Sequence, residues 1–283
     1  VVHEVDPAMP VHAKTMNTHF SYSQMNNGVD AEQFCDLSQI AGNDSAKWFN
    51  HGSGDWANSW QAQNMHFDLQ RSLRGQPIFN SENHVIIDRD LAYVPGVHIR
   101  NVLWQGSIHG EGASTMWVWE RTFDKQSDFA GSIMHRPECA EAHGRVALDL
   151  MRLAPEVTAF QQAPARVAVV YSIASLIYGT QESTSELLRA YHALNFCGEK
   201  IDFITERQLA AGKAKQYQVI LAPGITHLPE DALRGLAAYD GLVLTTSAKC
   251  LSRDDFDRPQ TVGMPKRLQV LPSVSAVELR DAL

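Results

Sequence analysis

The stretch Pro77-Ile78-Phe79-Asn80-Ser81-Glu82-Asn83-His84 passes directly from a short apolar run into a cluster of polar residues. An apolar run of this length next to turn-forming residues is typical of a buried β-strand. A pattern with apolar residues at helical spacing precedes it over about residues 58–73, and Gly75 ends that pattern. The order helix, strand, polar tip predicts a parallel sheet whose functional side chains lie at the carboxyl ends of its strands.

The same order recurs on both sides of this stretch. Residues 10–16 alternate between polar and apolar side chains and are predicted to form a strand. A weaker strand is predicted over residues 34–40, followed by the polar tip at residues 42–44. Residues 100–105 are predicted to form a further strand that leads into the polar segment 106–111. The first half of the chain is therefore expected to hold a sheet of parallel strands.

The composition changes near residue 165, because all six tryptophans and ten of the twelve histidines precede it. The second half alternates short apolar runs with helical patterns, which predicts a doubly wound parallel sheet. The predicted strands are residues 167–171, 201–204, 218–222 and 241–245, and the predicted helices are residues 185–194, 206–211 and 229–239. This half contains neither GxGxxG nor GxxxxGK[ST], so no nucleotide-phosphate loop is expected.

Two prolines mark the boundary between the halves. Residues 155–165 contain Pro155 and Pro164 and are predicted to form a linker. We therefore expect two domains, residues 1–154 and residues 166–283.

The composition excludes several classes of function. The chain has 283 residues and a net charge of −8 without a basic run, which argues against a nucleic-acid partner and against a membrane surface. No stretch approaches the roughly 20 apolar residues that span a bilayer. The four cysteines form no CxxC pair, and the histidines show no HxH, HxxxH or HExxH spacing. We therefore expect neither a metal site nor a cofactor.

Glu82 is the sharpest candidate for a catalytic residue. It follows a predicted buried strand directly and stands among amides and an imidazole that could keep it ionised by hydrogen bonding. An anionic carboxylate held rigidly at a strand end suits a glycosidase nucleophile. The alternative is a loop glutamate that caps the next helix.

The segment 104–111 is the second candidate. A tryptophan at a strand end can stack on the apolar face of a sugar, and polar neighbours can bind its hydroxyls. We expect a substrate-binding role for these residues, namely Trp104, Gln105, His109 and Glu111. The alternatives are that Trp104 belongs to the core and that Glu111 caps a turn. A packing role is expected for Trp117 and Trp119, which flank Val118.

Further binding candidates lie at the other predicted strand ends. Lys14 shares a strand face with His12 and could bind a hydroxyl or a carboxylate, although a satisfied buried pair is an equal alternative. Asn43 and Asp44 could bind hydroxyls or form only an Asx-turn. His84 stands two residues after Glu82 and is expected to contribute to the same site.

Other nucleophiles have weaker support. The sequence lacks GxSxG, so a serine nucleophile is not indicated. Cys250 follows the last predicted strand of the second half and leaves an amidotransferase-like reading open. Its neighbours Lys249 and Leu251 lack the small side chains that a tight nucleophile turn requires.

Taken in order, these motifs resemble the family 42 glycoside hydrolases and their relatives among the retaining TIM-barrel enzymes. Residues 10–16, 36–44, 77–82 and 103–111 look like barrel strands five to eight of that family. The segment 132–136 and the helix that runs to Leu153 look like the exit from the barrel, and the chain from residue 166 onward resembles the family's flavodoxin-like trimerisation domain. The resemblance implies an α/β chain made of a partial TIM barrel and a doubly wound domain.

The resemblance also implies a function. Glu82 would be the nucleophile of a retaining β-glycosidase that acts on oligo- or polysaccharide β-galactosides, with a β-mannoside or β-glucoside as the alternative. The family's acid/base glutamate stands in an Asn-Glu pair on the fourth strand, and no such pair occurs in this chain. We therefore expect a fragment that lacks the acid/base, from a protein that forms a homotrimer.

Two expectations stay open beside this reading. The chain could be a non-catalytic carbohydrate-binding or assembly protein built on a decayed barrel. It begins with Val1 and shows no signal peptide, which favours the cytoplasm over secretion, although we expect the N-terminus to be missing.

Overall fold

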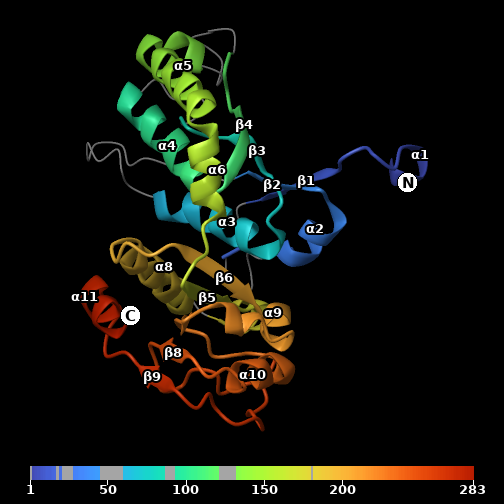
Figure 1. Cartoon of the computed structure of the whole chain (residues 1–283), viewed down its shortest axis with the longest axis vertical. Coiled ribbons are helices and arrows are strands. Elements are labelled where there is room, and N and C mark those ends of the chain that lie inside the picture. Colours follow the sequence, from blue (N-terminus) through green and yellow to red (C-terminus); the bar gives the residue numbers. More distant parts are fainter. Residues whose placement is uncertain are drawn as a thin grey trace. The chain divides into compact units, whose positions relative to one another are not determined.

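The computed structural model describes residues 2–16, 19–20, 28–44, 60–86, 93–120, 132–179 and 181–283. The chain divides into two compact units, and Figure 1 labels most of their elements. The first unit comprises residues 1–17, 34–71 and 75–163, and the second comprises residues 18–33, 72–74 and 164–283. Among the described residues, no helix is long and apolar enough to cross a membrane.

The first unit is built on a four-stranded parallel sheet, a partial barrel. Its strands follow one another in chain order: β1 (His12–Met16), β2 (Ile40–Asp44), β3 (Ile78–Asn83) and β4 (Glu111–Met116). Its helices are α1 (Val2–Val5), α2 (Ala31–Leu37), α3 (Trp60–Arg74), α4 (Gly96–His109), α5 (Pro137–Arg152) and α6 (Ala154–Gln162), with a 3₁₀ turn at Ile133–His135. The predicted strands at residues 10–16 and 77–79 and the predicted helix at 58–73 are confirmed.

Two of the predicted strands are wrong. Residues 34–37 belong to helix α2, and the strand β2 begins only at Ile40. Residues 100–105, with Trp104 and Gln105, lie inside helix α4, whose buried side chains recur at the three- and four-residue spacing of a helix. The apolar run 102–104 is too short to reveal that period. The fourth strand of this sheet is instead β4, which was not predicted.

Most of the segment expected to be a linker is helical. Helix α6 spans Ala154–Gln162, and Pro155 occupies its first turn, where the missing proline N–H leaves no hydrogen bond unmade. The second unit takes up the chain again at Pro164.

The second unit is a flavodoxin-like doubly wound sheet. Its parallel strands lie in the order β6-β5-β7-β8-β9, with β5 (Val167–Tyr171), β6 (Ile201–Thr205), β7 (Val219–Ala222), β8 (Leu242–Thr245) and β9 (Leu268–Val270). Its helices are α7 (Ile173–Tyr178), α8 (Gln181–Asn195), α9 (Glu206–Ala210), α10 (Glu230–Ala237) and α11 (Ala276–Ala282), with a 3₁₀ turn at Lys213–Gln216. The four predicted strands are confirmed, whereas α7, β9 and α11 were not predicted.

Apolar side chains cover both faces of this second sheet. Every residue of β5 is buried. Ala168 and Val170 share one core with leucines of α9 and α10. On the opposite face Phe203 of β6 stacks against Tyr191 of α8, with ring centroids 6.1 Å apart. A parallel strand buried on both faces needs an apolar residue at every position, which explains why β5 could be predicted from the sequence.

In the first unit, strand register decides which face each side chain takes. Lys14 pairs with Gly42 and Gly42 with Phe79, so these residues share one face, which we call the inner face. Thr15, Asn43 and Asn80 pair across the same strands one position further on and share the opposite face. There the side chain of Asn43 meets Gln70 of α3, which identifies that face as the helix face.

Gly42 is required by the close approach of β1. A Cβ atom at this position would lie 2.4 Å from the carbonyl oxygen of Ala13 and 2.2 Å from Nε2 of His12. His12 itself packs against Phe79, with ring centroids 5.0 Å apart. The glycine therefore lets β1 and β2 carry their polar ends side by side.

We expect Gly42→Ala to lower the free energy of unfolding by about 1–3 kcal/mol, because the new methyl group collides with backbone that cannot move aside. The matched control is Gly144→Ala in α5, where a Cβ would meet nothing within 4 Å. The control should be neutral or stabilise by roughly 0.5–1 kcal/mol, since alanine favours a helix. Urea unfolding of the intact protein measures both changes, and equal stability of the two variants would contradict the packing argument.

Candidate functional site

Four polar side chains meet on the inner face at the carboxyl ends of β1, β2 and β3. The ammonium of Lys14 donates to Oε2 of Glu82 and lies 3.4 Å from Oδ2 of Asp44. Nε2 of His84 lies 3.2 Å from Oε1 of Glu82 and 3.6 Å from Oδ1 of Asp44. The two carboxylates thus share one lysine and one imidazole. The structure brings together four predicted site residues, Lys14, Asp44, Glu82 and His84.

The environments of the two carboxylates differ. Hydrogen bonding from Lys14 lowers the pKa of Glu82, and the nearby His84 acts in the same direction. Burial raises the pKa of Asp44, although the charge of Lys14 opposes this. The same contact with Glu82 raises the pKa of Lys14. Glu82 is therefore the more firmly ionised of the two carboxylates, as an attacking nucleophile must be.

An extra residue in β3 turns the side chain of Glu82 toward the other members of this cluster. Asn80 pairs with Ser114 and Asn83 with Met116, so three steps along β3 match two steps along β4. Such a bulge shifts the alternation of side chains between the two faces. Burial follows the shift, because Ile78, Asn80 and Asn83 are buried while Ser81 and Glu82 are both partly exposed. The side chain of Asn80 accepts a hydrogen bond from the Glu82 N–H at 3.4 Å.

Trp117, whose expected role was packing, is next to this cluster. It follows β4 directly, its ring centroid lies 5.8 Å from that of His84, and its backbone N–H donates to the carbonyl of Asn83. A partly exposed indole at a strand end can carry a sugar ring. The sequence signal was weak, because β4 reads Glu-Gly-Ala-Ser-Thr-Met and lacks an apolar run.

The remaining predicted binding residues do not reach the cluster. Trp104 packs against the core between α4 and α5, and Gln105 is its neighbour in α4. His109 ends α4 and pairs with Asp68 of α3, with Nδ1 2.9 Å from the carboxylate. Asn43 points to the helix face, where it donates to Gln70 at 2.7 Å. Their predicted binding role assumed either that residues 100–105 form a strand or that Asn43 lies on the inner face of β2.

The backbone of Glu111 lies at the opposite end of β4 from the strand ends that form the cluster, but its side chain reaches Asn83 on the helix face. It opens β4 opposite Ile78, and its carboxylate points to the helix face beside Gly106 of α4. Burial raises its pKa to about 8, while hydrogen bonds from Ser114 and Asn83 act in the opposite direction. The side chain of Glu111 is thus a buried acid behind the sheet, away from the inner face.

Three residues of the cluster have metal-ligand chemistry. One ligand atom each of Asp44, Glu82 and His84 lies within 4.8 Å of the others. The ammonium of Lys14 already lies between the two carboxylates and supplies the positive charge there. A cation would have to displace it, so the arrangement favours an ion-pair network over a metal centre.

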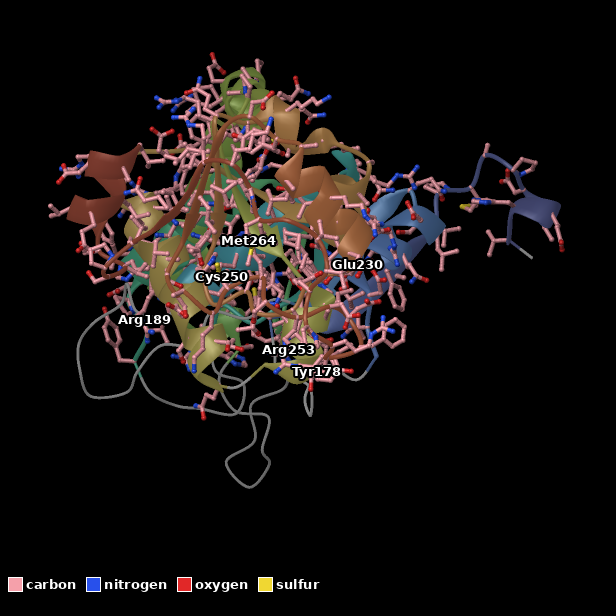
Figure 2. The ribbon with its side chains drawn as sticks, turned by 90° about the horizontal axis from the view of Figure 1, so that it is seen from below. Tyr178, Arg189, Glu230, Cys250, Arg253 and Met264 are labelled. Carbon is pink, nitrogen blue, oxygen red and sulfur yellow. The ribbon has the colours of Figure 1, made fainter. Side chains whose placement is uncertain are left out.

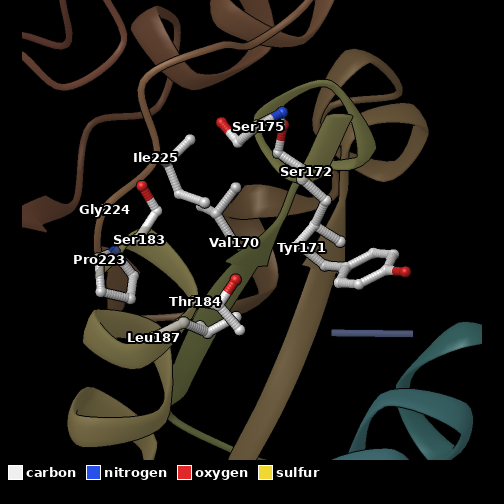
Figure 3. A pocket seen from close by; sticks show the side chains of 11 residues that line it. Val170, Tyr171, Ser172, Ser175, Ser183, Thr184, Leu187, Pro223, Gly224 and Ile225 are labelled. Carbon is white, nitrogen blue, oxygen red and sulfur yellow. Dashed lines mark hydrogen bonds between the residues drawn. The ribbon is translucent and has the colours of Figure 1, made fainter. Parts of the chain in front are cut away.

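The second unit offers less chemistry. Cys250, labelled in Figure 2, is buried, and burial raises the pKa of its thiol, which keeps it protonated and a weak nucleophile. A cavity lies where the chain leaves β5 and β7, as Figure 3 shows. Its lining residues carry no charge, and the hydroxyls of Ser172 and Ser175 both donate to the carbonyl of His227. The amidotransferase-like reading of Cys250 therefore gains no support.

Comparisons with known proteins concern the fold of the chain. No protein-family model matches the chain, and no curated protein matches it at a significant level. Among solved structures, an apo exo-carrageenase of glycoside hydrolase family 42 from Bacteroides ovatus matches 99% of this chain and 40% of its own, with 23% identity and a TM-score of 0.84. The E323A catalytic mutant of a family 42 β-galactosidase from G. stearothermophilus matches 94% of this chain and 41% of its own, with 18% identity and a TM-score of 0.70.

A more distant structure belongs to the same general class. An exo-β-1,4-mannosidase from Opitutaceae bacterium strain TAV5 matches 92% of this chain and 49% of its own, with 11% identity and a TM-score of 0.56. The chain therefore has the fold of these glycoside hydrolases, as the sequence resemblance predicted. It spans less than half the length of each of the three.

We expect Lys14→Met to raise the pKa of Glu82, because the hydrogen bond from Lys14 is the largest influence that lowers it. Burial and the neighbouring Asp44 would then act unopposed by the ammonium. A carboxyl-carbon NMR titration of the intact protein measures the change. The matched control is Lys249→Met, an exposed lysine of the second unit. An unchanged titration of Glu82 in Lys14→Met would contradict the described ion pair.

Glu111 should make the stability of the protein depend on pH. Its folded-state pKa of about 8 lies above its ordinary value of 4.5. Between these values the folded chain holds a proton that the unfolded chain has lost, so the free energy of unfolding falls as pH rises, by at most about 1.4 kcal/mol per pH unit.

Urea unfolding between pH 5 and pH 8 tests this expectation, and Glu111→Gln should remove that part of the fall. Glu141→Gln, an exposed change in α5, serves as the control and should keep it. Parallel pH curves for the wild type and Glu111→Gln would show that Glu111 titrates normally.

Proposed function

We propose that this chain carries the nucleophile of a retaining β-glycosidase and that Glu82 is that residue. The observation that carries the proposal is the ion pair on the inner face, where Lys14 keeps the Glu82 carboxylate ionised at a strand end. In a retaining mechanism this anion attacks the anomeric carbon, and water later hydrolyses the glycosyl-enzyme. The likeness of the fold to family 42 glycoside hydrolases supports the assignment.

The neighbours of Glu82 have distinct proposed roles. Lys14 holds the nucleophile ionised and in place, and Asp44 anchors that lysine from the adjacent strand. His84 lies against both carboxylates and also beside Trp117, so it would link the nucleophile to the surface on which the sugar rests. Trp117 replaces Trp104 as the proposed sugar platform.

The acid/base carboxyl is proposed to come from a part of the protein outside this chain. Retention requires a second carboxyl about 5–5.5 Å from the nucleophile. A carboxylate oxygen of Asp44 lies within 4.8 Å of one of Glu82, but the ammonium of Lys14 compensates the charge of Asp44. We therefore do not assign it that role, and we expect the described chain to be inactive by itself.

A β-galactoside is the proposed substrate, because the better-matching structures are a carrageenase and β-galactosidases. Carrageenan oligosaccharides belong in any substrate panel because of the first of these. A β-mannoside is the second candidate, through the mannosidase match. A homotrimer is proposed from the family resemblance, and sedimentation analysis of the intact protein would test it.

We expect 2-deoxy-2-fluoro-β-galactosides with a good leaving group to label Glu82 of the intact protein covalently. The fluorine slows hydrolysis of the glycosyl-enzyme, so the label accumulates and peptide mass spectrometry locates it. Fluorinated mannosides and glucosides, offered in parallel, identify the preferred sugar. Glu82→Ala should abolish labelling and turnover. Added azide should restore turnover in this variant, because azide attacks the anomeric carbon in place of the carboxylate and forms a glycosyl azide.

The control for labelling is Glu32→Ala, which removes a carboxylate of α2 outside the cluster and should leave labelling intact. A folded protein that binds sugar yet takes no label at Glu82 with any of these sugars would overturn the proposal. That outcome would favour the non-catalytic carbohydrate-binding protein instead.

A further inference from the structure

The face of the sheet to which the Glu82 side chain points depends on the placement of the next residue, Asn83. β3 contains one extra residue between Asn80 and Asn83, and the two ends of this bulge both point to the helix face. Without that residue the regular alternation would turn Glu82 toward the helices and Asn83 toward the inner face. Whatever holds Asn83 on the helix face therefore also holds Glu82 on the inner face.

Asn83 is held on the helix face by contacts in several directions. Its Nδ2 donates to the hydroxyl of Ser114 at 2.8 Å and to Oε1 of Glu111 at 3.3 Å. Its Oδ1 accepts from the side chain of Gln63 in α3 at 3.3 Å. The side chain is fully buried, so leaving these groups unpaired would be costly. The network joins β3 to β4 and to α3.

Glu111 supplies the carboxyl group at the centre of this network. It accepts from both Asn83 and Ser114, and it fits because Gly106 of α4 leaves room for its Oε2, which would lie 2.1 Å from a Cβ at that position. The same asparagine receives the backbone N–H of Trp117 on its carbonyl oxygen, at 2.9 Å. One anchored residue thus fixes the strand end that carries Glu82 and the start of the segment that carries Trp117.

We infer that Glu111 is a positioning residue for the nucleophile, acting through Asn83 and Ser114 from the helix face of the sheet. The inference rests on the proposed function, since it concerns the attack by Glu82. Glu111 touches no reacting atom. It holds the bulge in the register that presents Glu82 to the substrate, and in the same way it holds the backbone of Trp117.

The test compares an isosteric with a truncating change in the intact protein. Glu111→Gln keeps a side-chain oxygen that can accept from Asn83 and Ser114, whereas Glu111→Ala removes it. We expect Glu111→Gln to inactivate with the fluoro-sugar within about twofold of the wild-type rate. Glu111→Ala should inactivate roughly 10- to 100-fold more slowly at saturating reagent, because small displacements of a reacting group cost that much.

A control variant separates the positioning of Glu82 from the stability of the protein. Val146→Ala removes apolar contacts of α5 in the same unit and serves as a variant destabilised away from the bulge. All variants are assayed well below their unfolding temperatures. We expect the maximal rate of inactivation to fall in Glu111→Ala but not in Glu111→Gln or Val146→Ala, with little change in the reagent concentration that gives half of that rate. Asn83→Ala should reproduce this effect.

The outcomes separate the two claims. If the wild type is labelled on Glu82 and Glu111→Ala is labelled at the same rate, the positioning role is wrong and the proposed function stands. Equal slowing of Glu111→Ala and Val146→Ala would also overturn the positioning role, because it would reflect stability alone. If the wild type takes no label on Glu82, the proposed function itself fails.

Discussion

The candidate site depends on a departure from the strict alternation of a β-strand between Asn80 and Asn83. In β3 the side chains of Ile78 and Asn80 point to the helices, and a regular strand would send Glu82 after them into a buried layer. A carboxylate there would lose its hydration without gaining Lys14, and burial of an unpaired charge costs several kcal/mol. The extra residue before Asn83 avoids this cost. It puts the carboxylate where a lysine from β1 and an imidazole from its own strand end can reach it.

The layer between this sheet and its helices contains bonded polar side chains. Asn43 and Gln70 bond to each other, and Asn83 bonds to Ser114, Glu111 and Gln63, where most parallel sheets place apolar side chains. Apolar packing tolerates sliding, whereas a buried hydrogen bond is lost when its partners shift by about an ångström. A network of satisfied polar groups therefore holds a strand in one register more strictly than apolar contacts would.

Sequence reasoning succeeded where the physical signal is local. The apolar runs of β5 and β7 and the strand before Glu82 were recognisable because a buried parallel strand needs apolar residues in succession. Sequence reasoning failed where the same pattern of residues suits both a strand and a helix. Residues 100–105 suit a strand or a helix, and only their packing against α5 decides for α4. The strand β4 was missed because small polar residues fill it, and Trp117 was undervalued with it. No local pattern reveals the bulge, since register belongs to two strands at once.

The charges of the cluster are consistent with a second carboxyl that acts as an acid. Lys14 compensates one of the two carboxylates, so Lys14, Asp44 and Glu82 together carry one net negative charge when both carboxylates are ionised. A carboxyl brought to about 5–5.5 Å from Glu82 would be repelled by this charge in its ionised form, and its pKa would rise. A raised pKa is what a general acid needs at neutral pH, while Glu82, the proposed nucleophile, keeps a lowered pKa beside Lys14. Lys14 thus favours different protonation states for the two proposed catalytic groups. It stabilises the ionised form of Glu82, and the negative charge that remains on the cluster favours the protonated form of the second carboxyl.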